Sequence, residues 1–468
     1  MDSQPPSAAT PTVTPADGPS PGAEPGGRRA VVFGFIAAAS LLFGYDLGMM
    51  AGAILFIQKD LHLGAGMVGL ITSIVSAGTI GGMIFTGRIS DRFGRKRTLL
   101  VGTAILGLAA LGMSLSSGAG MLIAFRILMG VGLAATTTVV PPYLAELAPT
   151  ARRGGVTSLH QLMIAIGTLM AFLVGYFLSN SGAWRLIIGV GAVIAVVVLI
   201  GAAFQPESPR WLLRNGREAE ARAALRVCAP GEEDQIIAQL RDESGSVINK
   251  GRLIELLRNK SLRRVLVIGC AMGALQQLIG INTIVYYAPK ILQSVGFGTS
   301  TAIMNSVGLG LLSVIATAIE ARVVDRVGRR RLLQIGATLM LASMAALGLV
   351  FLLSVQSHLP GKVISVAALA VFKFAFSLSW GPLLWVTLPE IFPLPFRGAG
   401  VSFAALWSQV AQFVVTLVFP VMLVAGPAVI FFVFAAMCVL ALAFTAKLLT
   451  ELSRKSLETI EAEVLATP

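Results

Sequence analysis

An acidic and a basic residue each interrupt a strongly apolar stretch of this 468-residue chain. Asp46 lies in LLFGYDLGMMAGA and Arg126 lies in LIAFRILMG. A charge at the centre of a lipid-embedded helix costs about 2.5–3.5 kcal/mol or more, so both side chains should face the protein interior and find a partner. We predict that Asp46 and Arg126 pair while Asp46 is ionised and separate when it takes up a proton, which would make them a proton-coupling switch. A static ion pair is the alternative.

Uncharged polar side chains also stand in apolar stretches. Amides supply hydrogen-bond donors and acceptors without a charge, which suits the hydroxyl groups of a sugar, and they are costly in lipid unless paired. Indole rings add flat surfaces for the apolar face of such a ligand. The candidate ligand site comprises Gln161, Gln276, Gln277, Asn282, Asn305, Trp380, Trp407 and Phe376. The alternatives are that the amides join neighbouring helices and that Phe376 is a packing residue.

Two of these amides constrain the backbone. Gln276 and Asn282 are six residues apart, which places them about 240° apart around a straight helix. Both face one cavity only if the helix unwinds between them, and Gly280 permits that. Gly381-Pro382, directly after Trp380, predicts a second break.

Three other polar residues lie in apolar stretches. His160, beside Gln161, is expected to be a hydrogen-bonded wall residue. Lys373, seven residues before Trp380, would either narrow the outer vestibule or extend its ammonium group to the membrane interface. Glu320 is unusual near the end of its segment.

Two charged phrases repeat along the chain. GRISDRFGRKR at 87–97 returns as ARVVDRVGRRR at 321–331, an offset of 234 residues, and ELAPTARRG at 146–154 returns as EIFPLPFRG at 390–398, an offset of 244. Phrases that repeat in the same order indicate two six-helix halves that face the same way. Parallel repeats of this size are a plan of membrane transporters, with the substrate site at the midplane between the halves.

Composition supports a membrane protein. Hydrophobic residues make up 55% of the chain and charged residues 13%, against about 25% charged in an average globular domain. Stretches of about 20 apolar residues suit transmembrane helices. We predict an all-α polytopic protein whose twelve spans lie at about 30–57, 67–87, 99–117, 121–141, 156–178, 186–204, 265–287, 300–322, 332–354, 362–388, 398–424 and 427–449.

The net charge of +13 is concentrated in loops. This pattern predicts orientation against the cytoplasmic face rather than nucleic-acid binding, with both termini in the cytoplasm. Three isolated cysteines exclude a disulfide scaffold. Neither an enzyme, a metal site nor a cofactor is expected. The predicted organisation is a disordered tail 1–29, a six-helix bundle 30–204, a cytoplasmic helical linker 205–262, a second bundle 263–449 and a cytoplasmic tail 450–468.

Six motifs in this order resemble the sugar porter family of the major facilitator superfamily. They are DRFGRK at 91–96, PESPR at 206–210, QQLIGIN at 276–282, YY at 286–287, DRVGRR at 325–330 and PEIFP at 389–393. The resemblance, which covers about residues 30–450, implies that the amides and indoles line a sugar site. It implies an external gate at Tyr286 and Tyr287. It also implies a cytoplasmic latch made of Asp91, Arg92, Arg95, Glu146, Arg153, Glu207, Arg210, Asp325, Arg326, Arg329, Glu390 and Arg397. Solvated loop charges are the alternative to the latch.

The resemblance favours a transporter. Proton-coupled sugar porters carry an aspartate where this chain has Asp46. We expect a monomeric protein of the cell membrane that imports a monosaccharide, such as the hexose glucose, together with protons by alternating access. The expected partners are the sugar, the proton and membrane lipid. The alternatives are a facilitative uniporter, a polyol or inositol–proton symporter and a non-transporting sugar sensor.

Overall fold

The computed structural model describes residues 27–149, 153–245, 253–393 and 396–447. Within these ranges all regular structure is helical, and twelve helical segments are long and apolar enough to cross a membrane. Hydrocarbon offers no hydrogen-bond partners, so a chain this apolar satisfies its backbone groups within helices. The predicted all-α architecture with twelve spans is confirmed.

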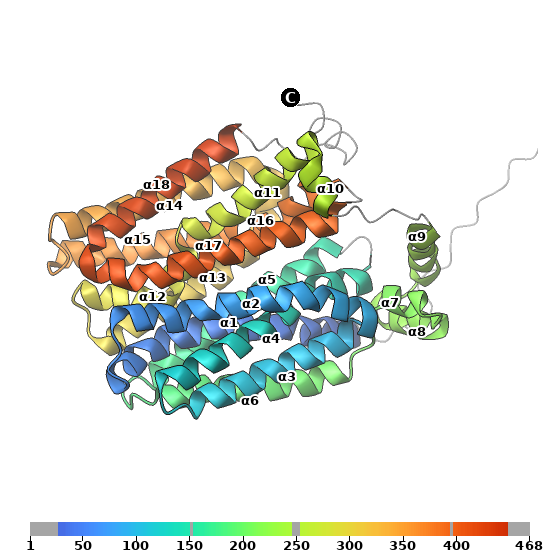
Figure 1. Cartoon of the computed structure of the whole chain (residues 1–468), viewed down its shortest axis with the longest axis horizontal. Helices are drawn as coiled ribbons and strands as arrows, with labels where there is room; N and C mark the ends of the chain where they lie inside the picture. Colours follow the sequence, from blue (N-terminus) through green and yellow to red (C-terminus); the bar gives the residue numbers. More distant parts are fainter. Residues whose placement is uncertain (1–26, 150–152, 246–252, 394–395, 448–468) are drawn as a thin grey trace, which may run out of the picture.

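The first six spans form one bundle, which we call the N-terminal half (Figure 1). Its helices are α1 (Gly27–Asp60), α2 (Ala65–Phe93), α3 (Arg95–Ser114), α4 (Ala119–Leu147), α5 (Arg153–Phe177) and α6 (Trp184–Ala203).

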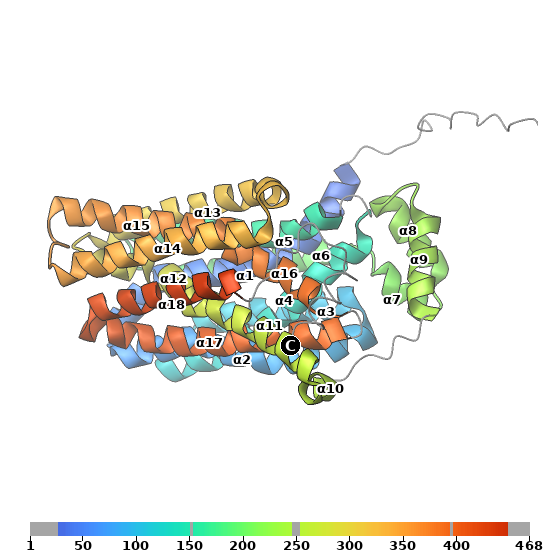
Figure 2. The same ribbon diagram turned by 90° about the horizontal axis from the view of Figure 1, so that it is seen from above.

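The other six spans form the C-terminal half, which lies beside the first along its whole length (Figures 1 and 2). Two of these spans each consist of two consecutive helices, α11 (Lys260–Leu278) with α12 (Ile281–Ser294), and α15 (Leu359–Leu378) with α16 (Trp380–Ile391). The remaining four are α13 (Thr299–Val327), α14 (Arg329–Leu352), α17 (Arg397–Ala425) and α18 (Pro427–Lys447).

Short helices separate the halves in sequence. They are α7 (Pro209–Arg214), α8 (Glu218–Cys228), α9 (Glu233–Gly245) and α10 (Leu253–Arg258). Helices α7–α9 lie beyond one end of the bundles (Figure 2). We call this end, which holds Gly94 and Gly328, the motif end, and the opposite end, which holds residues 61–64 and 295–298, the far end. A hydrogen bond from Arg222 holds the pKa of the Glu218 carboxyl in α8 below its usual range.

Glycines allow the N-terminal helices to pack closely. A Cβ added at Gly44 of α1 would lie 1.9 Å from the carbonyl oxygen of Ile164 in α5, and one added at Gly78 of α2 would lie 2.1 Å from that of Ile127 in α4. Small residues are what lipid-embedded helices use to approach each other. They bring α1 close to α5, and α2 close to α4.

Candidate functional site

Asp46 and Arg126 form a buried ion pair inside the N-terminal half. Arg126 Nη1 donates to Asp46 Oδ1, and the two side chains are 0% and 1% exposed, respectively. The same guanidinium donates from Nε to the Ile71 carbonyl (3.2 Å) and from Nη2 to the Thr72 carbonyl (3.1 Å). Arg126 therefore joins α1, α2 and α4 through one group, and the predicted pairing is confirmed.

The second oxygen of Asp46 meets the C-terminal half. Tyr286 of α12 donates its hydroxyl to Asp46 Oδ2 at 3.4 Å, and the Tyr287 hydroxyl is hydrogen-bonded to Thr72 Oγ1 of α2. Asp46 is therefore in contact with both halves at once.

Two more polar contacts join the halves towards the far end. Lys290 Nζ of α12 donates to Gln58 Oε1 of α1 at 2.8 Å, and Ser179, just after α5, donates to Ser300 of α13 at 3.3 Å. Together with the tyrosine contacts they hold the halves together on this side of the molecule.

A small cavity borders Asp46. Its volume is about 10 Å³, enough for one water molecule. It is lined by Leu42, Tyr45, Asp46, Met49, Leu106, Ala110, Met129 and Gly191, so it lies within the N-terminal half.

A chain of amides links four helices of the C-terminal half, α11, α12, α16 and α17. Asn282 Nδ2 donates to Gln277 Oε1 (2.8 Å), and Gln277 Nε2 donates to Gln276 Oε1 (3.1 Å) and to Ser408 of α17 (3.3 Å). Gln276 Nε2 then donates to the carbonyl of Trp380 at 2.8 Å. The chain therefore fixes α11, α16 and α17 to one another and leaves Asn282 partly exposed at its end.

The predicted helix break at Gly280 is present, whereas Gly381-Pro382, where the second break was predicted, lies inside α16. Gly280 separates α11 from α12 with a φ of +93°, a left-handed conformation that favours glycine. This break turns Asn282 back towards Gln277, the neighbour of Gln276, so that the amides on the two sides of the break meet. The second break lies at Ser379, just before Trp380 rather than after it. Ser379 packs where Gly336 of α14 has no side chain.

Known proteins resemble this chain in sequence over almost its whole length. Residues 32–464 match the family model described as "Sugar (and other) transporter". The D-xylose transporter of Levilactobacillus brevis is 38% identical over 93% of this chain and 95% of its own length. The galactose-proton symporter of Escherichia coli K12 is 35% identical over 92% of this chain and 93% of its own. The chain belongs to the sugar porter family of the major facilitator superfamily.

A solved structure of the family has the same fold. The partially occluded, inward-open xylose transporter XylE from E. coli superposes with a TM-score of 0.80 at 26% identity, covering 92% of this chain and all of XylE. The chain is therefore a multi-pass membrane protein, and the members of its family are transporters.

The tryptophan rings of this sugar porter do not have the surroundings that the sequence predicted. Trp380 is fully buried, and its Nε1 donates to the Leu333 carbonyl of α14 at 3.0 Å, so its backbone, not its indole, meets the amide chain. Trp385 was not predicted. It is 41% exposed and lies about 140° around α16 from Trp380. The signal that could have identified Trp385 is its place three residues after Pro382, inside the helix that follows the break. Trp407 of α17 is 44% exposed.

The other predicted ligand-site residues lie outside the amide chain. Asn305 donates to the Thr301 carbonyl one turn earlier in its own helix, α13 (2.9 Å). Phe376 is buried against Gly381, next to the break. Gln161 is partly buried on α5. His160 Nδ1 is 2.6 Å from Ser40 Oγ of α1, as expected of a hydrogen-bonded wall residue.

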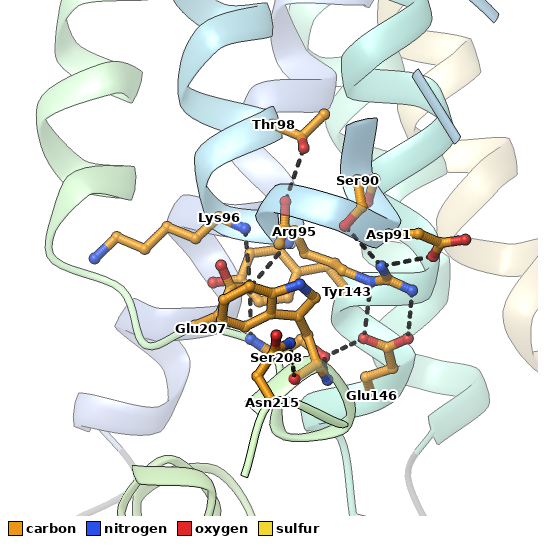
Figure 3. A network of polar contacts seen from close by, with 12 residues as sticks. Ser90, Asp91, Arg95, Lys96, Thr98, Tyr143, Glu146, Glu207, Ser208 and Asn215 are labelled. Atoms are coloured by element: carbon orange, nitrogen blue, oxygen red, sulfur yellow. Dashed lines mark hydrogen bonds and ion pairs between the residues drawn. The ribbon is translucent and has the colours of Figure 1, made fainter. Parts of the chain in front are cut away.

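Several residues predicted to form a latch in the N-terminal half make a network of polar contacts at the motif end (Figure 3). Arg95 Nη1 donates to Asp91 Oδ1 at 3.0 Å, and Arg95 Nε lies 3.3 Å from Glu146 Oε2. Glu146 also accepts a hydrogen bond from the Ser208 hydroxyl. Thus Glu146 joins the start of α3 to the segment that precedes α7.

Glu207 acts on backbone rather than on arginine. Its Oε1 accepts hydrogen bonds from the backbone N–H groups of Arg95 (2.9 Å) and Lys96 (3.1 Å), which are unpaired donors at the start of α3. Gly94 makes room for it, because a Cβ there would lie 2.2 Å from Glu207 Oε2 and the φ of Gly94 is +99°. The Gly of the DRFGRK motif is therefore required both by the turn and by Glu207.

The residues predicted to form the corresponding latch in the C-terminal half make fewer contacts with one another. Arg329 Nη2 donates to Glu390 Oε1 at 2.8 Å, while Glu390 Oε2 and Arg397 Nε have no hydrogen-bond partner in the described part of the chain. Arg326 is exposed, and Arg92 lies over the ring of its neighbour Phe93 at 5.3 Å. Three further residues were predicted to belong to the latch. Arg210 has an interaction that is not among the contacts given above. The side chains of Arg153 and Asp325 lie outside the described residues.

Proposed function

We propose that this sugar porter imports a monosaccharide of hexose size together with a proton, by alternating access. The observation that carries the proposal is the position of Asp46, which shares one carboxylate between Arg126 of its own half and Tyr286 of the other. A proton that binds this carboxylate changes the bonding of both halves at once. Relatives named as a galactose-proton symporter and a D-xylose transporter support the same activity.

Coupling would work through the two partners of the Asp46 carboxylate, Arg126 and Tyr286. Ionised Asp46 accepts from Arg126 and Tyr286, which favours contact between α12 and the N-terminal half. Protonation removes the charge that holds Arg126 and replaces an acceptor oxygen by a donor hydroxyl. The contact between Tyr286 and Asp46 then weakens, and the far end opens to admit sugar.

The sugar would bind beside the free end of the amide chain. Gln276 and Gln277 are held by one another and by backbone, so Asn282 is presented in a fixed orientation, and a pre-ordered donor and acceptor loses little freedom when it binds a hydroxyl. Gln161 of α5 would contact the ligand from the N-terminal half, and Trp385 and Trp407 would supply apolar surfaces. Asn305 is not included, because its amide is used within its own helix.

Orientation follows from the loop charges. The basic residues after α2 and α13 and those of the linker all lie at the motif end, so we place this end and both termini in the cytoplasm. The far end then faces the outside. Its contacts between halves, together with the incomplete latch at Glu390, correspond to a state that is closed to the outside.

The experiment that tests the proposal is uptake into proteoliposomes with and without an imposed proton gradient. The side chain of an Asp46→Asn variant cannot take up or release a proton. We expect its gradient-driven sugar accumulation to fall at least tenfold, while sugar counterflow, which needs no proton, is kept. Asp60→Asn is the matched control, because Asp60 pairs with Arg185 at the far end. Gradient-driven accumulation that survives Asp46→Asn would favour a uniporter and contradict the proposal.

A further inference from the structure

Lys373 is a cation deep inside the C-terminal half. It is 9% exposed and lies fourteen residues, about 21 Å, from the far-end start of α15 at Leu359. A four-carbon side chain cannot span that depth, so the expected extension of its ammonium group to the interface is not possible here. The alternative, a position inside the outer vestibule, is compatible with this depth.

The ammonium group of Lys373 has no counter-charge in the described part of the chain. The charged side chains that are buried in the described spans are Asp46, Arg126, Glu320 and Lys373. Asp46 and Arg126 pair, and Glu320 has interactions of its own. No hydrogen bond or ion pair joins Lys373 to a described residue. An unpaired charge in this setting is costly, so its presence points to a partner outside the chain.

Glu320 is too far away to be that partner. Helices α13 and α15 run in the same direction and are joined by the hydrogen bond between Ser313 and Ser377 (2.9 Å). Glu320 lies seven residues from Ser313 towards the motif end, whereas Lys373 lies four residues from Ser377 towards the far end. The two charges are therefore about 16 Å apart along the bundle.

The side chain of Lys373 is turned away from lipid. The exposed residues Ile364 and Val371 lie about 160–180° around α15 from Lys373, while the buried Phe376 and Ser377 lie within about 60° of it on either side. Lys373 therefore stands on the arc between the contact with α13 and the interior face that carries Phe376.

Lys373 also lies at the depth of the amide chain. Gln276 contacts the carbonyl of Trp380. From that contact, Lys373 is seven residues, about 10 Å, towards the far end, and Asn282 is six residues, about 9 Å, in the same direction. The cation and the free end of the amide chain are thus level with each other.

We propose that Lys373 binds the carboxylate of the transported sugar, so that the substrate class is a monosaccharide acid, such as a uronate or an aldonate. The proposal rests on the function proposed above and narrows its substrate. Amides would orient the hydroxyl groups and the ammonium group would select the negative charge through a charge-assisted hydrogen bond. When Asp46 is protonated, Arg126 loses its counter-ion, and an anionic substrate offsets the resulting excess of positive charge.

The test compares neutral and acidic sugars in proteoliposomes. Competition against labelled D-glucuronate is measured for D-glucose, D-glucuronate and D-gluconate, for the unmodified protein and for Lys373→Met and Lys373→Arg. We expect the acids to compete at least tenfold better than D-glucose. Lys373→Met should lose this preference, and Lys373→Arg should keep part of it. Lys362→Met is the matched control, because Lys362 lies on the same helix at the far end and donates to the Gly296 carbonyl.

Transport current gives a second readout that needs no variant. One proton carried with one sugar monoanion moves no net charge, whereas one proton carried with D-glucose moves one positive charge. Uptake of D-glucuronate that is driven by a proton gradient without current supports the proposal. If D-glucose is preferred, or if Lys373→Met keeps the preference for acids, the proposal is wrong while proton-coupled sugar import stands. If neither class of sugar is taken up, the proposed function itself fails.

Discussion

At the scale of single residues, the two tryptophans of α16 have opposite surroundings. Trp380 is enclosed and bonded to the Leu333 carbonyl, while Trp385 offers part of its ring to the space beside the helix. An enclosed indole contributes to stability, and an accessible one can contribute to ligand binding.

We therefore predict that Trp380→Phe mainly affects stability and that Trp385→Ala mainly affects sugar binding. Trp380→Phe should lower the free energy of unfolding by about 1 kcal/mol through the lost hydrogen bond and leave the KM for sugar unchanged. Trp385→Ala should raise that KM at least fivefold with a smaller effect on the melting temperature. Counterflow kinetics and thermal melting in detergent measure the two effects. Equal changes in KM for both variants would contradict this assignment.

At the scale of elements, the start of α3 depends on a carboxylate from the linker. The Glu207 carboxylate accepts hydrogen bonds from two backbone N–H groups. Glycine is the only residue type at position 94 that leaves room for this carboxylate. Removing a helix cap typically costs about 0.5–2 kcal/mol.

Gly94→Ala should therefore destabilise the protein by about 1–3 kcal/mol, since the new Cβ meets Glu207 and the backbone conformation disfavours a side chain. In a Glu207→Ala background the same substitution should cost less, because the clash is removed and only the backbone strain remains. Gly87→Ala is the control, as a Cβ there meets nothing within 4 Å. Thermal melting of the four variants gives the coupling, and additive effects would show that Gly94 and Glu207 act independently.

These elements also show what the sequence could predict. The twelve spans and the break at Gly280 follow from hydropathy and from the spacing of two amides, which are local signals. The contact of Glu207 with α3 could not be derived in this way, because its partners are backbone groups 111 and 112 residues away that leave no side-chain pattern. The direction of the Trp380 indole was missed for a different reason: the break at Ser379 interrupts the helical phase on which such predictions rely.

At the scale of the whole molecule, the two halves are joined by polar contacts towards the far end. The hydroxyl of Tyr287 meets Thr72 across the boundary, and Lys290 meets Gln58. At the motif end, the ion pairs described for the spans each lie within one half. The described polar contacts between the halves therefore lie towards the far end, as in the state closed to the outside that we propose.

Tyr287→Phe should shift the balance towards the outward-open state. Loss of one buried hydrogen bond of about 1 kcal/mol changes the ratio of two states about fivefold. The measurement is the rate at which an impermeant maleimide, added from the far side, labels an Asn282→Cys variant that lacks the three native cysteines. Tyr176→Phe is the control, because the Tyr176 ring contacts Phe177 of its own helix. An unchanged labelling rate would show that Tyr287 does not hold the far end closed.

The anchoring of Glu207 has a mechanical consequence. Ser208 is tied to Glu146, and Ala224 and Cys228 of α8 pack into the same apolar core as the membrane spans. The first part of the linker is therefore built onto one half and must travel with it. If the two halves rock during transport as proposed, α7 and α8 move together with the N-terminal half. A partner that binds α8 would then slow transport without contacting the sugar site.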